Sequence, residues 1–287
     1  MGLPLPADVP DADAPIVDFS WLDGDQSLAV PMLPAVAHRV IELASDPDVP
    51  LPTLSNLVAK DQVLAARVLG LANSAYSAPM QPITTVTEAV VRLGIAAVRN
   101  VVVTVCFASR MHDPAIYGRL GRDLVDHAIG TAYAARLIAE HARANRDEAF
   151  LYGLLHDIGK LIVLKLAHDH QKQHRTTIAP EIVELAVLER HAAMGALALR
   201  RWKLPESLDE PIMYHHDFQG APHRRKEAAV CYAANLLAHR YGFGCDRSDA
   251  DVLQDPVAVE LQLDEPWLVE IDARAPGLVN VAKQFLN

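Results

Sequence analysis

Helical periodicity runs through most of this 287-residue sequence and constrains its fold more than any other feature. Apolar residues recur every three or four positions, and no segment shows the alternation of a half-buried strand. The Val-rich stretch Val101–Val105 resembles a strand, but it lies inside a long apolar run between helical neighbours. Helices are predicted over residues 35–44, 54–59, 62–72, 86–94, 95–110, 123–142, 180–201 and 225–241, with shorter ones carrying residues 150–160 and ending at 215–217. The fold class predicted is all-α.

Capping residues mark several of the predicted helix starts. Asp61 precedes the helix at 62–72, Thr85 and Glu88 have the spacing of a capping box, and Asp147 is predicted to cap the helix that leads to His156. The polar stop Asn73–Tyr76 has two interpretations. Asn73 ends its helix in a left-handed conformation, or Tyr76 contributes to a groove that docks a partner.

The sequence divides into four segments. Residues 1–30 are rich in Pro and Asp and are predicted to be an arm laid over the domain, with Phe19 and Trp21 as anchors. Residues 31–112 form one predicted helical bundle and residues 113–244 a second, with a seam near residue 112. Residues 245–287 are predicted to be a looser C-terminal appendage.

Composition excludes several classes of function. The formal net charge is −10, so the field of the protein would repel a nucleic-acid backbone, and the one dense basic cluster, at residues 223–226, is too short to reverse this. The apolar run Ile95–Ala108 is interrupted by Arg99 and Asn100 and is too short to cross a bilayer. No signal peptide is recognisable. These features predict a soluble cytoplasmic protein without nucleic-acid or membrane partners.

The three cysteines give no sign of a disulfide framework. Cys106, Cys231 and Cys245 are far apart, form no CxxC pair and lie in or beside apolar stretches. They are predicted to be reduced, buried thiols, as expected in the cytosol.

His156 and Asp157 are adjacent in the mostly apolar run Phe150–Lys160, which predicts that both are buried. If the run is one helix, Lys160 shares a face with His156, while Asp157 points about 100° away. A neutral imidazole nitrogen and a carboxylate able to bridge suit one compact metal site or two adjacent ions. The alternative is a helix end with a solvated Asp and a buried structural His.

Further candidate ligands are spread over the second predicted bundle. His127, His156, Asp157, His191, His215 and His216 fall at or inside its helices, which is how helical bundles build metal sites. Glu184 lies two turns before His191 and is a candidate further ligand or outer contact. Single buried histidines are common, but six such residues in one bundle favour a cluster.

The order of these residues resembles the HD superfamily of metal-dependent phosphohydrolases. His127 comes first, then His156-Asp157-Ile-Gly-Lys160, then His191, and finally His215-His216. The segments Asp61–Tyr76, Thr87–Gly94 and His191–Pro205 narrow the resemblance to the HDOD family of HD-related output domains, over about residues 30–240.

The resemblance implies an HD-like second bundle in a bacterial signalling protein, often linked to cyclic di-GMP. It implies that the histidine cluster binds one or two Fe or Mn ions, or that the site is degenerate and metal-free. HDOD domains are mostly regulatory, and the sequence shows no receiver, cyclase or phosphodiesterase domain. Output is therefore expected through unidentified signalling protein partners.

The sequence also departs from the catalytic HD pattern. Active relatives carry a further Asp on the helix after the His pair, and Asn235 occupies that place here, either as a weak ligand or as an outer contact. The Gly-Tyr-Pro signature of cyclic di-GMP phosphodiesterases is absent after His216.

Three interpretations therefore stand. The chain is a partner-binding regulator with a degenerate site, or a phosphohydrolase acting on nucleotides or cyclic dinucleotides in which Lys160 steadies the phosphate. In the third, the histidines are purely structural and hold no metal.

Overall fold

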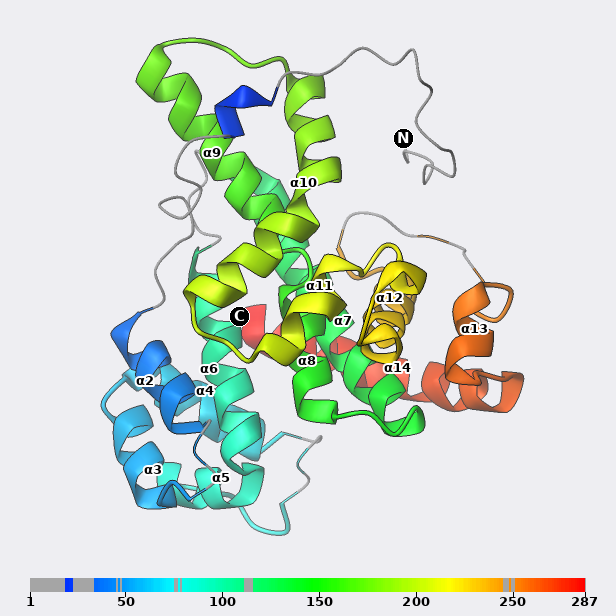
Figure 1. Cartoon of the computed structure of the whole chain (residues 1–287). Helices are drawn as coiled ribbons and strands as arrows, with labels where there is room; N and C mark the ends of the chain where they lie inside the picture. The colour runs from blue at the N-terminus through cyan, green and yellow to red at the C-terminus, as the bar shows by residue number, and fades with distance from the viewer. Residues whose placement is uncertain are drawn as a thin grey trace.

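The computed structural model describes residues 19–22, 34–44, 46, 48–74, 77, 79–110, 116–244, 248 and 251–286. Within these ranges the regular elements are helices, and strands are absent, so the all-α prediction is confirmed. Five helices make up the end of the molecule drawn in blue and cyan (Figure 1). They are α2 (Ala35–Ala44), α3 (Leu51–Ala59), α4 (Gln62–Ala72), α5 (Val86–Leu93) and α6 (Ile95–Arg110).

Local sequence explains how these helices begin. The Asp61 side chain accepts hydrogen bonds from the Val63 and Leu64 amides, as an N-cap should. Thr85 and Glu88 form the predicted capping box, with each side chain bonding the other's backbone amide. Helix α3 begins at Leu51, earlier than predicted, with Pro52 in its first turn, where a missing N–H costs nothing.

The remaining helices form the rest of the molecule. They are α7 (Gly118–His141), α8 (Arg146–Leu155), α9 (Ile158–His174), α10 (Pro180–Arg201), α11 (Asp209–Met213), α12 (Arg225–Arg240), α13 (Pro256–Leu261) and α14 (Glu265–Leu286). Short 3-10 turns lie at Ser20–Leu22 (η1), Glu206–Leu208 (η2) and Phe218–Gly220 (η3). Helix α7 packs against α8 and α12, while α9 and α10 run side by side (Figure 1).

A single helix was considered for the segment around His156 and Asp157. The structure shows two helices instead. Helix α8 ends at Leu155 and α9 begins at Ile158. Asp157 adopts φ −99° and ψ 5°, which turns the chain between the two helices. The packing of α9 on α10 requires this turn. A Cβ on Gly159 would lie 1.8 Å from the carbonyl oxygen of His191.

Two predicted caps are also wrong. Helix α8 is capped by Asn145, whose side chain accepts from the Asp147 and Glu148 amides, and Asp147 instead pairs with Arg136 at 2.7 Å. Asn73 does end α4, but at φ −97° and not in a left-handed conformation. Its amide bonds the backbone of Leu69 and Ile83. Tyr76 lies outside the described residues.

The two predicted bundles share one hydrophobic core. Helix α6 packs against α7 and α8, and buried residues from both sides belong to the same cluster. The predicted seam at residue 112 falls in the undescribed range 111–115, so the proposed boundary stays a prediction. At the N-terminal end, Leu22 is the buried anchor, and Arg190 lies over the ring of Phe19.

The C-terminal segment is more ordered than the predicted loose appendage. Helices α13 and α14 pack on α12 and α7, with Trp267 and Ile271 buried. The hydroxyl of Tyr241 donates to Asp272 at 2.8 Å, which ties α14 to the end of α12. Apolar residues at helical spacing in α13 and α14 make this packing, and the break at Gly242 and Gly244 separates them from the strongly periodic part of the sequence.

Two further predictions concern exposure and membranes. Cys106 and Cys231 are buried thiols, as expected, and Cys245 is not among the described residues. In the described part of the chain, no single helix is long and apolar enough to cross a membrane. Val86–Leu93 and Ile95–Ser109 are long and apolar enough only when taken together, and a bend of 111° separates them.

Candidate metal centre

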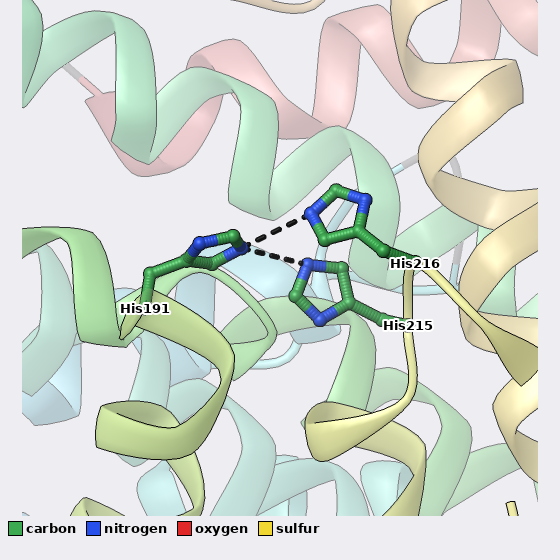
Figure 2. A group of neighbouring side chains, drawn as sticks. All are labelled: His191, His215 and His216. Carbon is green, nitrogen blue, oxygen red and sulfur yellow. Dashed lines mark hydrogen bonds between the residues drawn. The ribbon is translucent and has the colours of Figure 1, made fainter. Parts of the chain in front are cut away.

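Six of the predicted ligands come together in one cluster. His127 comes from the middle of α7, His156 and Asp157 from the turn between α8 and α9, and His191 from the middle of α10. His215 and His216 follow α11 and approach His191, as Figure 2 shows. The six residues form two groups able to hold a metal ion: a first group of His127, His156 and Asp157, and a second group of His191, His215 and His216.

Asp157 lies between the two groups and is nearly fully buried. Its Oδ2 faces the first group, 3.4 Å from His156 Nε2 and 3.8 Å from His127 Nε2. Its Oδ1 faces the second group, 3.6 Å from His191 Nε2 and 3.7 Å from His215 Nε2. One carboxylate therefore offers one oxygen to each group, which is the arrangement of a bridging ligand.

Backbone carbonyls fix which nitrogen of each imidazole faces the cluster. Nδ1 of His156 lies 2.8 Å from the Gly153 oxygen, Nδ1 of His191 lies 2.7 Å from the Val187 oxygen, and Nδ1 of His215 lies 2.6 Å from the Ile212 oxygen. A carbonyl oxygen only accepts, so each Nδ1 carries the proton. The Nε2 lone pairs are thereby turned toward the cluster, as in the outer contacts of metal-bound histidines.

These lone pairs face one another at short distance. His127 Nε2 lies 3.2 Å from His156 Nε2, and His191 Nε2 lies 3.2 Å and 3.1 Å from Nε2 of His215 and His216. The tautomers of His156, His191 and His215 leave no proton on their Nε2 atoms, so in the neutral cluster only His127 and His216 can donate across these distances. A cation among the lone pairs would make the arrangement more favourable.

Protonation of His127, His191, His215 or His216 does not supply that cation near neutral pH. Burial, followed by repulsion from His156, lowers the pKa of His127 to about 3. Burial likewise lowers the pKa of His191 and, with His216, takes that of His215 well below its usual range. For His216, lost hydration on the side facing the cluster and the nearby His191 lower the pKa to about 3.

The carboxylate of Asp157 also favours a bound cation. Asp157 Oδ1 is buried and has no hydrogen-bond partner in the described part of the protein. Such an orphaned oxygen is costly unless a cation binds it. Converging Nε2 atoms and an unsatisfied carboxylate oxygen fit divalent ions that accept imidazole and carboxylate ligands.

Lys160 does not share a face with His156, because the helix breaks between them. Its Nζ donates to Asp157 Oδ2 at 2.6 Å. Burial opposes the charge of Asp157, but His156 and Lys160 outweigh it and hold the pKa of this carboxyl well below its usual range. His156 and Lys160 together therefore keep the bridging carboxylate ionised.

Asn235 lies in direct contact with His127 of the first group. Its Oδ1 is 2.9 Å from His127 Nε2, and α12 brings it there. Glu184 is different: it is exposed on α10, and none of the hydrogen bonds or ion pairs of the described residues joins it to the cluster.

Two contacts of His127 were missed from the sequence. The His239 ring lies 4.5 Å from that of His127, and the Phe243 carbonyl lies 3.4 Å from its Nδ1. The only sequence signal for His239 is its spacing of one helical turn after Asn235. The contact itself depends on how α12 packs on α7.

The cluster reaches solvent at His216 and beside Lys160. His127, His156, His191 and His215 are buried, whereas His216 is exposed and the Lys160 side chain is 29% exposed. A molecule from solvent would therefore meet the second group and Lys160 first.

Solved structures of other proteins share this fold. An HDOD domain protein of unknown function from Geobacter sulfurreducens matches with a TM-score of 0.71 and 23% identity, over 92% of this chain and 99% of that one. A protein from Shewanella amazonensis, provisionally named a metal-dependent phosphohydrolase, matches with a TM-score of 0.67 and 20% identity, over 88% of this chain and 92% of that one.

Sequence comparison gives the family. An uncharacterized protein of Treponema pallidum is 28% identical over 211 residues, which is 69% of this chain and 39% of the relative's length. The family model of the HDOD domain matches residues 30–218. The resemblance drawn from the motifs is thus confirmed, and the chain belongs to the HDOD domain family.

Proposed function

We propose that this protein is a bacterial cytoplasmic regulator in signal transduction, which acts by binding other proteins and carries a degenerate HD-type metal site. The observation that carries the proposal is the amide oxygen of Asn235, 2.9 Å from His127 Nε2, where the resemblance leads one to expect a carboxylate. A link to cyclic di-GMP signalling is part of the proposal and rests on family resemblance alone.

In this proposal His127, His156 and Asp157 hold one divalent ion, and His191, His215 and His216, with the second oxygen of Asp157, hold another. Iron and manganese suit imidazole and carboxylate ligands. When bound, such ions supply Lewis-acid chemistry. Asp157 is the one carboxylate among these ligands, and Lys160 already pairs with it. The protein therefore offers little negative charge to balance two divalent ions, and the first group is expected to retain its ion weakly.

The second candidate is a metal-dependent phosphohydrolase acting on nucleotides or cyclic dinucleotides. It is favoured by the convergence of all six predicted ligands and by the exposure of His216 beside Lys160. In that case Lys160 would bind a phosphate oxygen of the substrate and offset the charge that develops there. Asp157 would hold its charge throughout, since its pKa lies far below neutrality.

Metal content and turnover distinguish the candidates. Protein purified without an affinity tag is analysed for Fe and Mn, and then assayed on bis(p-nitrophenyl) phosphate and cyclic di-GMP with added Mn²⁺. The regulator is expected to contain metal in the second group and to show no turnover. Turnover that disappears in His156→Ala would overturn it in favour of the hydrolase.

The Asn235→Asp variant sharpens the same experiment. If the amide is what disables the site, the variant should contain more metal than the wild type. A protein that holds no stoichiometric metal in either form would instead support purely structural histidines, and a chelator would then leave its stability unchanged.

A further inference from the structure

A second polar site lies away from the metal centre, where the N-terminal helices α4, α5 and α6 face α7 and α8. It is a cavity of about 250 Å³ between these two sets of helices. Its apolar wall includes Leu71, Val101 and Phe150, and its polar wall includes Arg92, Asn100 and Arg136. The ring of Tyr133 stands edge-on to that of Phe150, 5.2 Å away, and also lines the cavity.

The positive charge of Arg92 is not balanced within the described residues. Its guanidinium donates to the backbone oxygen of Ser77 at 2.6 Å, and no carboxylate forms an ion pair with it. A guanidinium has five donor hydrogens in a fork that matches carboxylate or phosphate oxygens. Arg136, across the cavity, is paired with Asp147 at 2.7 Å, so that acid balances Arg136 and not Arg92.

Asn100 contributes a buried polar group with weak internal bonds. Its side chain is on the cavity wall and the residue is only 3% exposed. Its Nδ2 lies 3.4 Å from the Asp147 oxygen, and its Oδ1 lies 3.5 Å from Arg99 Nε. Both distances are at the long limit for hydrogen bonds, so a ligand group placed in the cavity could offer the amide a better partner.

We propose that this cavity binds a small organic anion. A ring or short hydrocarbon body lies against Leu71, Val101 and Phe150, and its phosphate, phosphonate or carboxylate group binds Arg92. Asn100 and Arg136 provide further polar contacts. The combination of an apolar wall with a few converging polar groups is what small-molecule sites share. This inference is independent of the function proposed for the metal centre.

The cavity is separate from the metal centre, although the same helices reach both. Tyr133 and Arg136 follow His127 on α7 by six and nine residues, which is roughly 9 and 14 Å along a helix axis. Phe150 precedes His156 by six residues, again roughly 9 Å along α8. Probe binding at one site can therefore be distinguished from binding at the other by substitution.

The test is a calorimetric titration of the full chain, freed of metal with EDTA, with phenylphosphonate, which a phosphohydrolase cannot cleave. Benzoate, inorganic phosphate and uncharged benzyl alcohol are titrated in parallel. Phenylphosphonate or benzoate is expected to bind at one molecule per chain, and the stronger of the two identifies the preferred anionic group. Inorganic phosphate and benzyl alcohol are expected to bind more weakly, because phosphate lacks the apolar ring and benzyl alcohol lacks the anionic group.

Two variants locate the probe. Arg92→Gln is expected to weaken binding by about tenfold or more, the loss expected for a charge-assisted hydrogen bond. Ala97→Leu, which puts a larger side chain on the cavity wall, is expected to abolish it. The matched control Arg39→Gln removes an exposed arginine elsewhere in the same end of the molecule and should bind as wild type.

Three results would overturn the proposal. These are no binding of phenylphosphonate or benzoate at millimolar concentration, equal binding of benzyl alcohol, and undiminished binding in both Arg92→Gln and Ala97→Leu. Binding that persists in Arg92→Gln but is lost in His156→Ala would assign the probe to the histidine cluster and would also refute the cavity.

Discussion

The two ligand groups share Asp157 but differ in their surroundings. In the first group His127 and His156 are 5% and 0% exposed, and the half-buried Asn235 and His239 lie against His127. In the second group His191 and His215 are buried, but His216 is exposed. We call the first group closed because all its ligands are buried, and the second group open because His216 is exposed.

This difference separates two properties of the site. The first group lacks a second carboxylate, so we expect it to bind its ion more weakly than the second group does. Whether the protein retains one ion or two therefore depends on the first group. The second group has three imidazoles and an open edge, so it governs what reaches a bound ion from solvent. A site that keeps the open group but weakens the closed one suits the regulatory proposal better than hydrolysis, which needs ions that stay bound.

The largest expected effect comes from Asp157→Asn, because both groups lose their shared charge. Metal affinity should fall in both by roughly two orders of magnitude or more, as expected when a buried charge beside a cation is removed. Elemental analysis after dialysis should find no ion in the variant. Asp217→Asn is the matched control, since Asp217 is exposed beside His216 and its capping bond to Gly220 survives as an amide. Loss of metal from one group only would contradict the bridging role.

The next effect is on stability at acid pH without metal. The pKa of His127 is about 3 in the folded protein, against an ordinary value of 6.5. Between these values the unfolded chain binds more protons, so the free energy of unfolding falls as pH falls from 6.5 toward 3. The loss is on the order of a few kcal/mol for this buried group.

Urea unfolding in EDTA between pH 7.5 and 4.5 measures this loss. His127→Gln should flatten the pH dependence more than His216→Gln, because water at the exposed edge lessens the cost of charging His216. His174→Gln, exposed on α9, is the control. An equal effect of the first two variants would remove the distinction between a closed and an open group.

Sequence reasoning succeeded where local signals decide the structure. The bounds of α2, α4, α6 and α10 match the predicted ranges, because periodicity and caps are local. The six ligands were found as a set because each falls at or inside a predicted helix of one bundle. Their division into two groups around Asp157 could not be read from spacing, since it depends on the crossing of α7, α9 and α10.

The failures have tertiary causes. The chain turns at Asp157 inside an unbroken apolar run, because α9 must approach α10 closely at Gly159. Asn145 and Asp147 are both good caps, and the choice between them depends on Arg136 of another helix, which pairs with Asp147. Asn235 was expected at the place of the missing Asp, as a weak ligand or an outer contact, and the packing of α12 on α7 puts its oxygen on His127.

Asn235→Asp should strengthen the first group alone. A carboxylate at this position adds one negative charge to the ion held by His127 and His156, and we expect roughly 10- to 100-fold tighter binding there. Competition against a chromophoric chelator should show one affinity changed and the other within about twofold of wild type. Gln219→Glu adds the same charge on the exposed turn after His216 and controls for a general field effect. Equal strengthening of both affinities would mean that the two groups do not act separately.

The smallest expected effect is that of Lys160→Met. The ammonium lies 2.6 Å from Asp157 Oδ2, the oxygen that faces the first group. Removing this positive charge should tighten metal binding by about fivefold, equivalent to about 1 kcal/mol at a partly exposed position, and more in the first group than in the second. Lys160→Arg keeps the charge and should bind metal as the wild type does. Weaker binding in Lys160→Met would mean that the lysine matters chiefly for orienting the carboxylate, and that the geometry of the bridge outweighs its net charge.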